Sequence, residues 1–174
     1  MKQIIYLIAF LVLATSCEKE KEPENLSKLF SSVESSGCGS FTVYKLNEKE
    51  NMAIAVLGYN TDLDISTTEQ TFDLSQMNPD VLRVEVIKTT QGMHYYCNDV
   101  IEVDDEILDK WTSTKGKVSI RITDDYANNP PQFCIDTYRV DVRIENVYLE
   151  NSKGDKVFVE YLEFKDVIVG WCPG

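Results

Sequence analysis

Acidic side chains are the most numerous groups in this chain that could do chemistry. The sequence has 29 Asp and Glu residues against 17 Lys and Arg, and a single histidine, His94. Six of the acids fall in stretches that we expect to be loops: Asp62, Asp64, Asp104, Asp105, Asp124 and Asp125. Carboxylate oxygens gathered at one end of a β-domain are ligands that calcium prefers. Because no EF-hand spacing is present, we weigh a calcium site against ordinary solvated loop acids.

Catalytic motifs are sparse in comparison. A Ser–His–Asp arrangement would have to use His94, and the sequence contains no Gly-x-Ser-x-Gly elbow. Two carboxylates could act as acid and base in glycoside hydrolysis, but that chemistry depends on their separation in space. We therefore keep a small calcium-dependent or carboxylate-based hydrolase of the cell surface as an alternative function.

Aromatic residues beside expected loops favour binding over catalysis. The candidates are Tyr95, Tyr96, Trp111, Tyr126 and Trp171. Exposed rings stack on sugar faces or anchor a protein partner, so a protein or glycan partner is the expectation. The competing interpretation is that such rings are core or edge plugs, since large aromatic side chains are usually mostly buried.

The cysteines indicate an exported protein. Apart from Cys17, the chain has Cys38, Cys97, Cys134 and Cys172, and no Cys-x-x-Cys pair, which argues against zinc. Four cysteines in an oxidising compartment favour two disulfides, with three connectivities open. We favour Cys97–Cys134, which would tie off a loop-rich excursion, together with Cys38–Cys172, which would join the two ends of the domain.

The N-terminal residues read as a signal peptide. Lys2 precedes a ten-residue apolar run, Ile4–Leu13, about half the length of a transmembrane helix. Small residues 14–16 then lead to Cys17 and resemble a bacterial lipobox, which implies that Cys17 is the lipid-modified first residue. Ala14 stands where leucine or valine is usual, so cleavage by an ordinary signal peptidase and an incidental Cys17 stay open.

Charge and composition narrow the partners and the location. Removing residues 1–16 takes away one charged side chain, Lys2, so the formal net charge goes from −12 to −13. Such an acidic chain is repelled by nucleic acid and by anionic membrane faces, and membrane attachment would come from acyl chains. The acidic run behind Cys17 also resembles the export signals of surface lipoproteins in some Gram-negative bacteria. We expect an outer-membrane lipoprotein of the cell envelope, either surface-exposed or facing the periplasm.

The hydropathy pattern predicts three segments: a signal peptide at 1–16, a lipidated cysteine with a flexible acidic tether at 17–36, and a β-domain at 37–174. Within the tether, residues 26–36 have apolar residues at helical spacing and could form a short helix or an ordered strap. Residues 104–111 have a similar spacing and predict a helical turn.

Alternation of apolar and polar residues predicts about seven strands. The predicted strands are residues 40–46, 52–59, a short one around 72–74, 81–90, 117–123, 138–149 and 156–169. Both faces of 52–59 are apolar, so this strand should be covered on both sides. The apolar phase switches near residues 145, 161 and 165, and each switch requires a bulge or a bend.

These features together predict an all-β fold, an antiparallel β-sandwich (immunoglobulin-like or related) with at most one or two short helical turns. The runs 111–118, 138–140, 146–147 and 151–155 are similar to small bacterial cell-surface lipoproteins with a β-sandwich domain, a resemblance that covers about residues 37–174. It implies a fold and a location, and it assigns no functional residue. We expect a surface-anchored binding or interaction module; a structural part of an envelope complex is a further alternative.

Overall fold

The computed structural model describes residues 22–90, 96–97, 106–125 and 135–171. Its elements are β1 (Glu24–Asn25), α2 (Ser27–Phe30), β2 (Ser35–Cys38), β3 (Thr42–Asn47), β4 (Met52–Gly58), α3 (Asn60–Leu63), β5 (Gln70–Asp73), β6 (Leu82–Thr89), β7 (Ile107–Asp125), β8 (Ile135–Asn151) and β9 (Lys156–Trp171). The all-β prediction is confirmed in this part of the chain. The helical turn expected at 104–111 is wrong for Ile107 onwards, because these residues pair with β6 as the start of β7.

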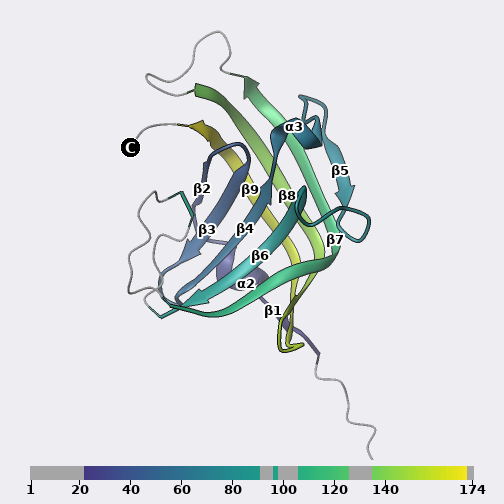
Figure 1. Ribbon diagram of the computed structural model, residues 1–174. Coiled ribbons are helices and arrows are strands. Elements are labelled where there is room, and N and C mark those ends of the chain that lie inside the picture. Colours follow the sequence, from purple (N-terminus) through teal and green to yellow (C-terminus); the bar gives the residue numbers. More distant parts are fainter. Residues whose placement is uncertain (1–21, 91–95, 98–105, 126–134, 172–174) are drawn as a thin grey trace, which may run out of the picture.

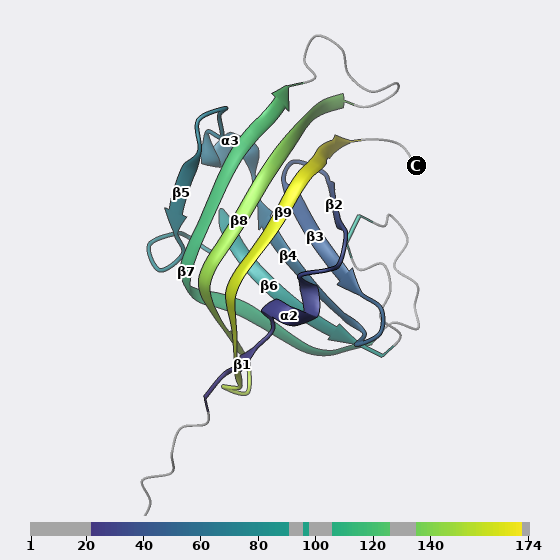
Figure 2. The same cartoon turned by 180° about the vertical axis from the view of Figure 1, so that it is seen from behind.

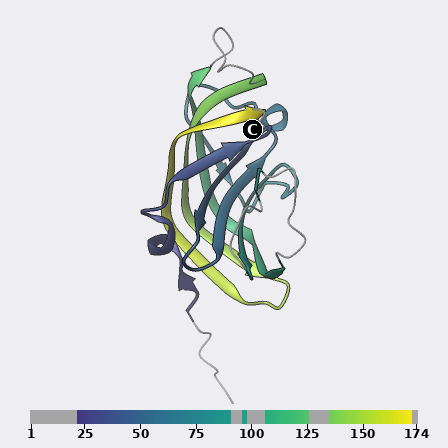
Figure 3. The same ribbon diagram turned by 90° about the vertical axis from the view of Figure 1, so that its left-hand side faces the viewer.

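The strands form one strongly curled sheet in the order β1-β9-β8-β7-β6-β4-β3-β2, and β5 adds to β7. All pairs are antiparallel except β1 with β9, which is parallel. Figures 1 and 2 show β7, β8 and β9 running the full height of this half-barrel, and Figure 3 shows the curl from the side. The strands do not clearly divide into the two sheets of the expected sandwich: β7 pairs with β6 along its first part and with β5 further on, so one curled sheet results.

Bulges lie at two of the predicted phase changes, which confirms those expectations. Asn146 on β8 and Asp166 on β9 have positive φ angles of 51° and 53°. Opposite Asn146, the register of β7 with β8 shifts at Gly116, where a Cβ atom would lie 2.6 Å from the Cα of Val147. Each bulge lets a long strand bend while it keeps its apolar side chains on the inner face.

The main core fills the inside of the half-barrel. Its largest fully buried apolar side chains include Phe30, Phe41, Ile54, Ile120 and Phe164. A second, smaller cluster lies on the outer side of β4 and contains Ala53, Ala55, Ile87 and Tyr96. Strand β4 is therefore buried on both faces, as its sequence predicted.

The segment before β2 belongs to the folded domain, so the tether expected at 17–36 is shorter than predicted. Strand β1 pairs with the edge of β9, and Ser27 accepts hydrogen bonds from the backbone N–H groups of Glu160 and Tyr161 through its Oγ (2.9 and 3.3 Å). Leu26 and Phe30 are buried in the core. The expectation of a short helix within 26–36 is confirmed for α2, whereas Ser35 and Ser36 belong to β2.

Two polar side chains of β3 hold α2 and the residues that follow it in place from the other side. The Nζ of Lys45 donates to the carbonyl of Val33 (2.6 Å), and the Nδ2 of Asn47 donates to the carbonyl of Leu29 (2.6 Å). Lys45 is only 5% exposed, and burial lowers the pKa of its amine while Glu163 opposes that effect. α2 thus connects β3 to β9 across the open side of the curled sheet.

The two edges of the sheet come together beyond α2. Gly39 forms an isolated antiparallel bridge with Gly170, next to the end of β9. Gly37 approaches β9 so closely that a Cβ atom would lie 2.6 Å from the carbonyl oxygen of Ile168. Among the described residues, none of the helices has the length and apolar character needed to cross a bilayer.

Candidate functional site

A disulfide joins Cys38 of β2 to Cys97, with a Cα–Cα distance of 5.7 Å. Both predicted pairings, Cys97–Cys134 and Cys38–Cys172, are therefore wrong, while Cys134 and Cys172 themselves lie outside the described residues. The reason is tertiary: Tyr96 packs on the outer side of β4 and against Tyr44 of β3 (ring centroids 5.5 Å apart), which brings Cys97 next to β2.

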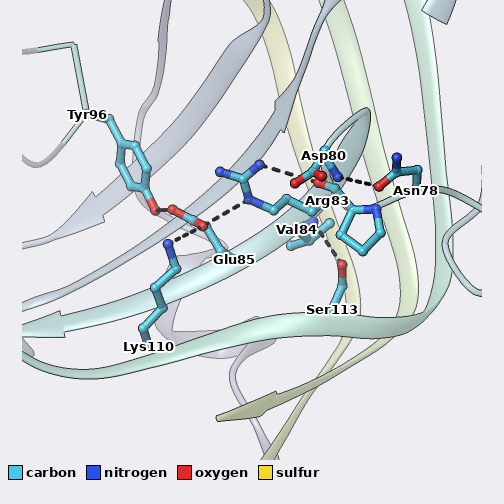
Figure 4. A network of polar contacts seen from close by, with 9 residues as sticks. Asn78, Asp80, Arg83, Val84, Glu85, Tyr96, Lys110 and Ser113 are labelled. Carbon is cyan, nitrogen blue, oxygen red and sulfur yellow. Dashed lines mark hydrogen bonds and ion pairs between the residues drawn. The ribbon is translucent and has the colours of Figure 1, made fainter. Parts of the chain in front are cut away.

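A buried carboxylate also holds Tyr96 and Cys97 in place. Glu85 on β6 is 1% exposed, and its Oε1 accepts a hydrogen bond from the Tyr96 hydroxyl (2.8 Å). Its Oε2 lies 2.8 Å from Nζ of Lys110 and 3.2 Å from Nε of Arg83 (Figure 4). Two cations and one hydroxyl thus surround a charge that would otherwise be costly to bury.

The surroundings of this network are held by backbone contacts. Arg83 also donates to the carbonyl of Pro79 (3.4 Å), and the amide of Val84 donates to Oγ of Ser113 (3.0 Å). In Figure 4 the Glu85 carboxylate points toward both Tyr96 and Lys110. With both oxygens engaged, Glu85 is suited to position residues 96–97 on the sheet.

The sequence pattern placed Glu85 on the polar face of its strand and missed this role. The signal that could have revealed it is Ile87, which lies on the same face of β6 and is fully buried. Together with the apolar outer face of β4, Ile87 indicates that something covers this side of the sheet.

The predicted calcium ligands are spread over the surface. Asp62 and Asp64 are exposed around α3, Asp124 is exposed near the end of β7, and Asp125 is the last residue of β7. Asp104 and Asp105 lie outside the described residues. Within the described ranges, no three Asp, Glu, His or Cys side chains come together as a metal site.

The predicted binding aromatics do not form an exposed platform where they are described. Tyr96 and Trp111 are 7% and 8% exposed, so the binding role is wrong for these two rings. Trp111 is part of the main core, as the competing interpretation held, and its Nε1 has no partner among the described groups. Tyr95, Tyr126 and His94 lie outside the described residues; Trp171 ends β9, and its side chain is not described.

The outer face of β7, β8 and β9 carries a different set of aromatic and charged side chains, which sequence patterns did not single out. Tyr161 is 44% exposed, and its hydroxyl donates to Oε1 of Glu163 (2.5 Å). Lys165 pairs with the other oxygen of Glu163 (2.8 Å), and Arg143 pairs with Glu69 (3.2 Å). Hydrogen bonds from Lys165 and Tyr161 hold the pKa of Glu163 below its usual value, and the bond to Glu163 raises the pKa of Tyr161.

An aromatic pair continues this face toward the β8–β9 turn. The rings of Tyr148 and Phe158 are cross-strand partners with centroids 4.5 Å apart. The Nζ of Lys115 lies 4.0 Å from the centroid of the Tyr148 ring, a cation–π geometry. We refer to Lys115, Tyr148, Phe158 and Tyr161 as the outer aromatic strip.

In the other direction, charged residues surround the bulge at Asp166. The amide of Asp166 donates to Oδ1 of Asp141 (3.0 Å), whose Oδ2 accepts from Arg121 (2.8 Å). Arg139 binds both the carbonyl and the carboxylate of Asp166 (3.0 and 2.7 Å). Burial disfavours ionisation of Asp141, but the Asp166 amide and Arg121 outweigh it and keep the pKa of that carboxyl below its ordinary value.

Comparison with known proteins gave no match to this chain among family models, curated proteins or solved structures. The fold defines the protein only as a mostly-β domain built from one strongly curled sheet. The candidate site is described by the contacts given above.

Proposed function

We propose that this chain is an exported lipoprotein, anchored through Cys17, whose half-barrel domain is a binding module of the cell envelope. The observation that carries the location is the Cys38–Cys97 disulfide, because such bonds persist in oxidising compartments. The lipobox-like residues before Cys17 and the short polar stretch up to Glu24 support an anchor.

The outer aromatic strip is the surface that supports binding. It combines an exposed tyrosine, a half-buried aromatic pair and a lysine on three adjacent long strands. Aromatic faces flanked by hydrogen-bonding groups stack well on sugar rings, and Glu163 and Arg143 supply such groups beside Tyr161. We propose a glycan of the envelope as the ligand.

The anchor is tested by growing cells with a radiolabelled fatty acid and comparing the native chain with Cys17→Ser. The native protein should carry label and enter the detergent phase, and the variant should do neither. A native protein without label would refute the anchor.

Binding is tested with residues 22–174 against a panel of envelope polysaccharides. Tyr161→Ala and Tyr148→Ala should each weaken binding about tenfold, as expected for loss of a stacked ring. Tyr59→Ala is the matched control, because Tyr59 is 54% exposed at the end of β4, outside the strip, and should bind as the native domain does. Equal loss in all three variants, or no binding by the native domain, would refute the proposed ligand class.

A further inference from the structure

The parallel pairing of β1 with β9 fixes the end of the domain at which the chain enters. Glu24 lies opposite Val157 and Asn25 lies opposite Phe158, close to the start of β9. Because the two strands run in the same direction, the chain before Glu24 comes from beyond the start of β9, where the β8–β9 turn also lies. We call this the turn end (bottom in Figures 1 and 2).

The opposite end of the half-barrel lies at the other end of the long strands. There β7 ends at Asp125, β8 begins at Ile135 and β9 ends at Trp171. We call this the far end. Strand β9 has 16 residues. At a rise of about 3.3 Å per residue and a tilt of about 40°, the far end stands about 40 Å above the turn end.

The tether is shorter than this height. Glu24 is seven residues after Cys17, and a fully extended chain of that length spans at most about 25 Å. A domain attached at its turn end by a link of that length cannot invert to place its far end against the bilayer. The link contributes no apolar residue that could hold the domain in another way.

We propose that the domain sits on its membrane with the β8–β9 turn toward the bilayer and the far end directed away from it. This inference rests on the proposed lipid anchor. It leaves the outer face of β7, β8 and β9 open from the side.

The test uses energy transfer from two positions of the full, lipidated protein to acceptor-labelled headgroups in phosphatidylethanolamine vesicles. A donor dye is attached through an azide-bearing residue in place of Ser152, in the β8–β9 turn, or of Thr123, near the end of β7; both side chains are exposed. Transfer from position 152 should exceed that from position 123 by at least about twofold, given the reach of the tether and the strand length. Equal transfer from both positions would overturn the orientation.

A control variant separates the effect of tether length from other causes of the orientation. Inserting a Gly/Ser linker of about 20 residues between Glu22 and Pro23 extends the reach beyond the height of the domain, so the two transfer values should converge. A difference that persists unchanged with the long linker would overturn the argument from tether length. If the native protein shows no transfer from either position, the anchor itself fails, which distinguishes failure of the proposed function from failure of the orientation alone.

Discussion

The hydrogen bond from Tyr96 to Glu85 allows a sharp test of how residues 96–97 are held. Tyr96→Phe keeps the ring that packs on Tyr44 and removes only the hydroxyl, which donates to a carboxylate that is 1% exposed. A hydrogen bond to a charged group contributes about 1.5–3 kcal/mol, so we expect a loss of that order in the free energy of unfolding.

Glu85→Ala should cost more than Tyr96→Phe, because it also removes the partner of two cations. Arg83 and Lys110 are 31% and 40% exposed, so each can turn to solvent and each contact contributes under about 1 kcal/mol. We therefore expect a total loss of about 3–4 kcal/mol for Glu85→Ala, and a coupling of about 1–2 kcal/mol with Tyr96→Phe in a double-mutant cycle.

The assay is urea unfolding of the oxidised protein, followed by tryptophan fluorescence and circular dichroism. The matched control is the cycle of Tyr161→Phe with Glu163→Ala, which has the same chemistry at a 2.5 Å distance on an exposed face. Its coupling should stay below about 0.5 kcal/mol, since exposed polar pairs contribute little. Equal coupling energies in the two cycles would show that burial does not strengthen the Glu85 contact, and would refute the reasoning.

Three further predictions concern stability. Replacing Cys38 and Cys97 by serine opens a loop with a sequence separation of 59 and should lower the free energy of unfolding by about 4 kcal/mol, measured by urea titration against the oxidised native chain; a loss under about 1 kcal/mol contradicts the loop-entropy account. Gly116→Ala should destabilise the protein by about 3 kcal/mol or more in thermal melts, because φ is +126° and a Cβ atom would clash with Val147. Gly154→Ala is the control: φ is +86° there but the space is open, so it should cost about 1 kcal/mol. Similar costs for the two variants would argue against close packing at the bulge. For Lys45, burial puts the folded-state pKa below the ordinary 10.5, so the unfolded chain holds more protons than the folded one as the pH approaches 10.5. The stability of the native protein relative to Lys45→Met should therefore rise between neutral pH and about pH 9.5. A stability difference that stays constant or falls in urea titrations contradicts the shift.

Local patterns predicted most of the strands but missed β2 and the first part of β7. The alternation in β6, in β8 and in the hairpin of β3 and β4 reports which side chains face inward, and this depends only on neighbours in the sequence. The bulges at Asn146 and Asp166 were foreseen for the same reason, because a phase change within one apolar run requires a local bend. The covering of both faces of β4 also follows from its own residues.

Long-range partners were not predictable in this way. The cysteine pairing depends on the position of Cys97 in the fold. Tyr96 fixes that position because it packs on Tyr44 and is hydrogen-bonded to Glu85. The helical spacing around Trp111 was overruled because β6 offers that segment a pairing edge. The outer aromatic strip joins residues from three strands, so no single stretch of sequence contains its pattern.

The sequence by itself determined most of the strands, two bends of the long strands, the acidic charge and the residues that resemble an export signal. Only the tertiary structure decided that one continuous sheet curls on itself, that Cys38 meets Cys97, and that Glu85 is buried. The physical reason is that side-chain alternation records which face of a strand is apolar, whereas curvature and cross-strand partners depend on contacts between residues far apart in the chain.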